Sequence, residues 1–113
     1  MKKDPKVFIG HISECIELIE IHIKNQTFES FKNSIQLQDS LIRRLEIIGE
    51  AIKNLPEDFR KKFPEIAWKN IAGMRDILVH EYFGVDMVLT WTVVKKELPV
   101  LKRRVEKILK EIE

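Results

Sequence analysis

The residue types best suited to chemistry lie together in residues 74–84, which we call the motif segment. It contains an arginine, a histidine and a tyrosine in the pattern R-x-x-x-x-H-x-Y, as Arg75, His80 and Tyr82. In a helix, Asp76 and His80 are four residues apart and therefore share one face, and Arg75 lies roughly one turn before the histidine. An arginine, a carboxylate and an imidazole can together hold a phosphate and move a proton.

A purely structural explanation of the motif segment is also open. Arg75 and Asp76 then form an ion pair, and His80 caps a helix end. Tyr82 packs its ring on Phe83 or Val79, and its hydroxyl bonds to a backbone carbonyl. The pattern alone does not exclude this explanation, because short motifs often match by chance.

The elements that must position the motif segment are predicted to be helices, because apolar residues recur along the chain at three- and four-residue spacing. Proline, glycine and capping residues give the expected bounds. We expect long helices over residues 5–24, 35–55 and 66–83, short ones over 28–32 and 56–63, and a last helix from residue 87, kinked or split at Pro99.

Several single residues refine this prediction. Asp4, Asp86 and either Asn33 or Ser34 are expected N-caps, and Gly49 is expected at a tight helix crossing. The motif segment falls at the carboxyl end of the third long helix, with Gly84 as its C-cap. The negative partial charge of such an end favours a protonated His80.

The last helix has two distinct parts. Residues 87–94 are apolar nearly all round, which predicts that they are covered both by the chain's own core and by a second subunit. Farther along, Lys102, Arg103, Arg104, Lys107 and Lys110 form a basic side. Such a side is usually solvated, but it is also suited to following a phosphate backbone.

Composition limits the class of protein. The 113 residues are 44% hydrophobic and 34% charged, with a formal net charge of +2. This predicts one domain over residues 1–113, with no membrane span or signal peptide.

Cys15 is the single cysteine, which fits a reducing cytoplasm. His11, Cys15 and His22 lie at similar angles around the first helix, but the two histidines are about three turns apart, so we expect no metal site.

No strand alternation, internal repeat or glycine-rich phosphate loop is visible. The predicted fold is therefore all-α: an antiparallel, up-and-down four-helix bundle with short extra helices.

The chain resembles the HepT-like toxins of the HEPN superfamily. The resemblance extends over nearly the whole chain and is carried by residues 39–51, Trp68, Ile71, the Gly73-Met74-Arg75 step, residues 80–86 and Trp91. Two positions depart from the family pattern. Ala67 stands where many relatives carry proline, and Asp76 stands where relatives often have asparagine. The second departure puts a carboxylate beside the imidazole of His80, which favours the protonated form.

The resemblance implies a HEPN-like homodimer that acts as a metal-independent endoribonuclease and needs no cofactor. Arg75 and His80 would be catalytic, with Asp76 supporting them, in a composite site at the dimer interface. It further implies a type VII-like toxin–antitoxin system of the HepT/MntA type. There, a cognate nucleotidyltransferase antitoxin uses ATP to attach AMP to Tyr82.

A second hypothesis comes from a different functional class. The chain can instead be a non-catalytic, nucleotide-binding module that pairs with a nucleotidyltransferase subunit. The intact Arg75, His80 and Tyr82 favour the enzyme over this alternative.

Overall fold

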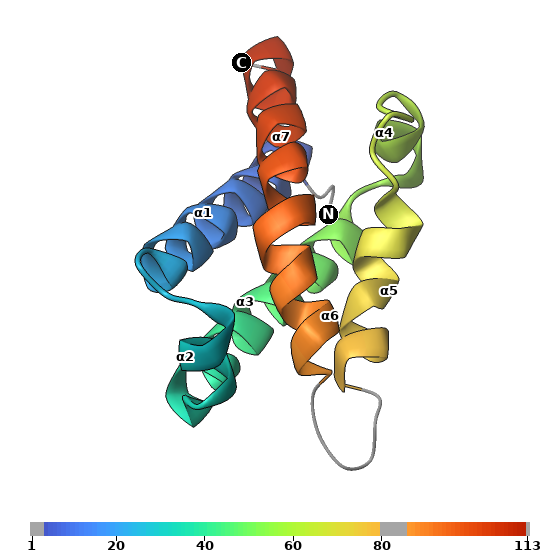
Figure 1. Ribbon diagram of the computed structural model, residues 1–113. Helices are drawn as coiled ribbons and strands as arrows, with labels where there is room; N and C mark the ends of the chain where they lie inside the picture. Colours follow the sequence, from blue (N-terminus) through green and yellow to red (C-terminus); the bar gives the residue numbers. More distant parts are fainter. Residues whose placement is uncertain (1–3, 80–85, 113) are drawn as a thin grey trace.

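The computed structural model describes residues 4–79 and 86–112, together with the side chains of these residues outside 74–79. Every regular element in this part of the chain is a helix (Figure 1), which confirms the predicted all-α class. The elements are α1 (Pro5–Ile23), α2 (Phe28–Lys32), α3 (Ile35–Asn54), α4 (Glu57–Lys61), α5 (Trp68–Val79), α6 (Met87–Thr92), the π-helical η1 (Val93–Glu97) and α7 (Leu98–Ile112).

The first three helices begin at capping residues. The carboxylate of Asp4 accepts a hydrogen bond from the amide of Lys6 at 2.9 Å, with Pro5 in the first helical position. Thr27 and Ser30 form a reciprocal capping box at the start of α2. Ser34, and not Asn33, caps α3 by accepting from the amide of Leu37 at 3.1 Å.

The turn between α4 and α5 differs in its bounds from the prediction. α4 ends at Lys61 and α5 begins only at Trp68, two residues later than expected. The tryptophan explains the late start, because its indole Nε1 donates to the carbonyls of Arg60 and Phe63, both at 3.1 Å. These bonds tie the chain back onto α4 before the new helix begins. The predicted continuation to residue 83 and the Gly84 cap lie outside the described residues.

The helix is not split at Pro99, which lies in the first turn of α7 directly after the π-helical η1. The hydrogen-bond pattern widens in η1, where the amide of Leu98 donates to the carbonyl of Val93, five residues earlier. Proline has no amide hydrogen to donate to the carbonyl four residues before it, and a π-helical segment accommodates such a defect. α6, η1 and α7 consequently run on as one long helical segment (Figure 1).

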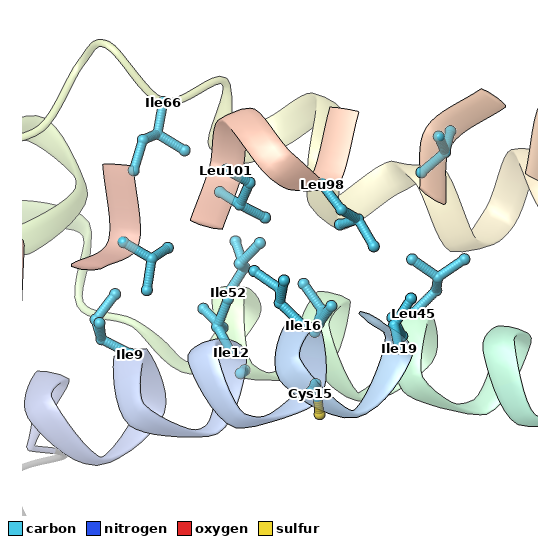
Figure 2. Close-up of a cluster of buried hydrophobic side chains, with 14 of the residues drawn as sticks. Ile9, Ile12, Cys15, Ile16, Ile19, Leu45, Ile52, Ile66, Leu98 and Leu101 are labelled. Carbon is cyan, nitrogen blue, oxygen red and sulfur yellow. The ribbon is translucent and has the colours of Figure 1, made fainter. Parts of the chain in front are cut away.

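The core lies where α1, α3 and α7 meet. Figure 2 shows one row of buried α1 side chains facing Leu45 and Ile52 of α3 and Leu98 and Leu101 of α7. Ile66, just before α5, joins the same cluster. The row from α1 contains Ile9, Ile12, Cys15, Ile16 and Ile19.

α5 packs against α3 at the predicted glycine. A Cβ atom on Gly49 would stand 3.4 Å from the carbonyl oxygen of Ala72 and 4.0 Å from its Cα. The two backbones therefore approach closely at this point, which confirms the expected tight crossing.

Among the described helices, none is both long enough and apolar enough to cross a bilayer.

Candidate functional site

The first two predicted site residues lie on α5. Arg75 and Asp76 follow the crossing point at Ala72 by three and four residues, so they lie about one helical turn beyond it. α3 and α5 run in opposite directions (Figure 1). The part of α3 that precedes Gly49 therefore accompanies the part of α5 that carries Arg75.

His80 and Tyr82 lie outside the described residues. The structure thus shows the helix that leads into this part of the motif segment and the helix that leaves it. α5 is described to Val79, and Asp86 introduces α6.

The start of α6 is firmly held. The carboxylate of Asp86 accepts from the amide of Leu89 at 2.9 Å, which confirms its predicted role as an N-cap. The hydroxyl of Thr90 donates to the carbonyl of Asp86 at 2.7 Å, and Thr90 is completely buried. The two hydrogen bonds therefore order the first turn of α6, and the buried Thr90 packs that turn into the interior.

An aromatic pair attaches the next turn to α2. The ring of Trp91 stacks on Phe31 with a centroid distance of 5.2 Å and an interplanar angle of 27°. The ammonium of Lys95 lies 5.8 Å from the Trp91 ring, in cation–π range. Phe31 is fully buried, so this stack connects the helix after the motif segment to the interior. The sequence marked Trp91, but nothing in its local pattern indicated Phe31 as the partner.

The apolar start of α6 is only partly covered by its own chain. Val88 is 65% exposed, whereas Thr90, Val93 and Val94 are buried. One side of the segment therefore packs inward, as predicted, and the other carries an exposed valine two residues after the Asp86 cap.

Cys15 is inert within the core. It is 4% exposed and free, and burial raises the pKa of its thiol, an effect that the neighbouring Arg44 guanidinium opposes. His11 and His22 are exposed on α1. Within the described ranges, no three His, Cys, Asp or Glu side chains form a group that could hold a metal ion.

The basic side of α7 is used partly for internal contacts. The ammonium of Lys102 lies 2.6 Å from a carboxylate oxygen of Glu20, and this contact raises the pKa of Lys102 and links α7 to α1. Arg104 donates to the carbonyl of Glu65 at 2.6 Å. Arg103, Lys107 and Lys110 remain exposed.

The sequence did not lead to the basic hollow between α4 and the start of α5. Arg60, Lys61 and Lys69 line a hollow of about 340 Å³ beside Trp68. The signal that could have found it is the basic run of residues 60–62 before Pro64, with Lys69 after it, together with a tryptophan that needs hydrogen-bond acceptors.

Comparison with known proteins places this helical frame in a family. The family model described as "Ribonuclease HepT-like" matches residues 12–108. A protein of Thermococcus cleftensis named "Probable ribonuclease HepT" is 47% identical over 97% of this chain and all of its own length. No solved structure shows a significant match.

A longer relative also matches. The Methanocaldococcus jannaschii protein named "Gamma-glutamylcyclotransferase and putative RNase" is 56% identical over all 113 residues, and the chain spans 51% of that protein's length. The family match includes the whole motif segment and most of the described helices. The chain therefore belongs to the HepT-like ribonuclease family.

Proposed function

We propose that this chain is a metal-independent endoribonuclease in which Arg75 and His80 carry the reaction. The observation that carries the proposal is the family match over residues 12–108, which contains both residues in an intact R-x-x-x-x-H-x-Y pattern. Membership of this family assigns the chain to enzymes that cleave RNA. What the proposal adds is the mechanism, the assembly and the regulation.

RNA supplies its own nucleophile. The ribose 2′-hydroxyl loses its proton to a base and attacks the adjacent phosphorus, and an acid protonates the departing 5′-oxygen. The products are a 2′,3′-cyclic phosphate and a free 5′-hydroxyl. A histidine titrating near neutral pH serves as base or acid, and the guanidinium of Arg75 stabilises the negative charge that develops on the phosphorane. Asp76 supports the protonated form of His80.

The reaction needs two proton-transfer groups, and each motif segment contains one histidine. A two-fold dimer that brings two motif segments to one cleft supplies both. The exposed Val88 favours an interface that includes α6, because α6 begins directly after the motif segment.

The proposal also includes regulation within a toxin–antitoxin pair in the cytoplasm. A partner nucleotidyltransferase transfers AMP from ATP to the hydroxyl of Tyr82 and releases pyrophosphate. The added phosphate would occupy the anion site of Arg75 and repel incoming RNA. A Tyr82→Phe chain co-expressed with the nucleotidyltransferase is expected to gain no AMP mass and to remain active.

The deciding experiment is RNA cleavage by the purified chain in the presence of EDTA. His80→Ala and Arg75→Ala should each lower the rate by roughly 10²-fold or more, which is the usual effect of losing a proton-transfer group or a charge-stabilising donor. His22→Ala and Arg103→Ala are matched controls, because both residues are exposed and lie on α1 and α7.

Helical content, followed by circular dichroism, should stay the same in all four variants. Cleavage by His80→Ala at the wild-type rate would refute the mechanism. A wild-type chain that binds the nucleotidyltransferase but cuts no RNA would favour the non-catalytic module instead.

A further inference from the structure

The side chain of Arg60 has one buried nitrogen without a hydrogen-bond partner in the part of the chain that the structure describes. The Nε atom of Arg60 is buried and makes no hydrogen bond to any described residue. A buried donor without an acceptor is unfavourable. A surface anion does not reach the buried Nε, but it can pair with the terminal amino groups of the same guanidinium. Arg60 is half-buried, so the rest of its side chain reaches the surface.

The backbone around Arg60 is held in place. Trp68 is 7% exposed, and its indole Nε1 donates to the carbonyl of Arg60 and to that of Phe63. The carbonyl of Arg60 therefore takes part in the hydrogen bonds that connect α4 to α5, whereas its buried side-chain Nε does not. A ligand that binds the guanidinium meets a backbone that is already positioned.

The surface beside Arg60 is hollowed and positively charged. The hollow of about 340 Å³ is lined by Arg60 and Lys61 from α4 and by Lys69 and Asn70 from the first turn of α5, next to Trp68. Glu57 is the one carboxylate in its lining, and it lies 3.6 Å from the ammonium of Lys61. Three cations thus face one anion, and that anion already neighbours one of them.

We propose that this hollow binds a backbone phosphate of the RNA strand whose cleavage is assigned above to the motif segment. Arg60 would contact the phosphate through paired donors, and Lys69 would supply a second charge. The inference rests on the proposed function, to which it adds a second contact with the same substrate. Neither Arg60 nor Lys69 takes part in the chemical step.

The length of α5 between the hollow and the motif residues fits an extended RNA strand better than a compact anion. Lys69 lies in the first turn of α5 and Val79 is its last residue, so the helix separates the hollow from the end of the motif helix by about 15 Å. A stacked strand advances roughly 3.4 Å per nucleotide, so about four nucleotides connect the two places. A strand laid along α5 would reach both.

The test uses single strands that cannot be cut. RNA oligonucleotides of two and eight nucleotides, with every 2′-hydroxyl methylated and a fluorescent end label, are titrated with the intact chain and followed by anisotropy. The variant is Arg60→Gln with Lys69→Gln. The control is Lys6→Gln with Lys24→Gln, which removes the same charge from exposed positions at the two ends of α1.

We expect the Arg60→Gln, Lys69→Gln chain to bind the eight-nucleotide strand roughly 10- to 100-fold more weakly than wild type. Its dependence on salt should fall by about 0.7 in log–log slope, because one phosphate contact on a single strand is lost. The two-nucleotide strand should bind both proteins much more weakly than the eight-nucleotide strand binds wild type, since it is too short to reach both places at once. Arg60→Lys should restore the salt slope but only part of the affinity.

Equal affinity of the double variant and wild type for the eight-nucleotide strand would overturn the inference. So would an equal loss in the α1 control, because the effect would then reflect net charge alone. If RNA binding is unchanged but binding to the partner nucleotidyltransferase weakens, the hollow is a protein contact and the inference is also wrong. Cleavage of unmodified RNA by the wild-type chain is measured separately, so failure of the proposed function and failure of this inference give different results.

Discussion

At the scale of single residues, Cys15 shows how the surrounding core decides what a side chain can do. By sequence it is a lone thiol in line with two histidines. In the structure it is buried with a raised pKa, whereas His11 and His22 are exposed. The thiol is therefore kept protonated and acts as a small apolar group of the core.

This burial predicts a dependence of stability on pH. The thiol of the unfolded chain ionises near its ordinary pKa of 9.0, while the folded chain keeps its proton to a higher pH. Between the two values the folded state binds more protons, so the free energy of unfolding falls as pH rises, by at most about 1.4 kcal/mol per pH unit. The contribution is fully present below the unfolded pKa and is lost as pH rises through the folded one.

Urea denaturation of wild type and Cys15→Ala at pH 7.0 and pH 9.5 measures this effect. The stability difference between the two proteins should be smaller or reversed at the higher pH, because only wild type has the thiol. The two values of pH are compared within each protein, so the packing cost of the substitution cancels. Parallel losses of stability in both proteins would show that the thiol does not contribute.

At the scale of elements, the crossing of α3 and α5 determines where Arg75 stands. Gly49 faces the backbone of Ala72, and a Cβ at Gly49 would be in ordinary van der Waals contact. A methyl group therefore fits, but a larger side chain would separate the two helices. Such a separation would move the motif helix away from α3.

Gly49→Ala should leave the free energy of unfolding unchanged or raise it by up to about 1 kcal/mol, because alanine is the better helix former. Gly49→Leu should lower it by about 1–3 kcal/mol through overpacking. Gly10→Leu is the matched control, since a Cβ at Gly10 meets nothing within 4 Å. If Gly49→Leu is as stable as Gly10→Leu in urea denaturation, the crossing is not tight.

At the scale of the whole molecule, the proposed composite site requires a second copy. Val88 is a large apolar residue exposed directly after the motif segment, and Val7 is another one, on α1. Val88→Asp should convert a dimer to a monomer and abolish cleavage, because an unpaired carboxylate would be buried at the interface.

Light scattering of wild type, Val88→Asp and Val7→Asp at micromolar concentration measures the assembly, and the same samples are assayed on RNA. Val7→Asp should remain dimeric and active. A monomeric wild type that still cuts RNA would contradict the composite site, and a fully dimeric Val88→Asp would exclude α6 from the interface.

The sequence determined the features that depend on near neighbours. Asp4, Ser34 and Asp86 act as caps as predicted, because a capping bond joins residues two or three positions apart. The apolar spacing correctly predicted the all-α class and the rows of buried residues, because a helix brings residues three and four positions apart onto one face. The R-x-x-x-x-H-x-Y pattern was inconclusive by itself. Together with residues 39–51, Trp68, Ile71, Gly73-Met74 and Trp91 it led to the family, which the match over residues 12–108 confirms.

Only the tertiary structure decided the features that depend on distant partners. The late start of α5 follows from Trp68 bonding back to α4, and the local pattern instead predicted a start at residue 66. The stack of Trp91 on Phe31 joins residues 60 positions apart, and the contact of Lys102 with Glu20 spans 82. Such contacts form once the packed helices bring separate segments together, and helical periodicity specifies the face of a residue but not the partner it meets.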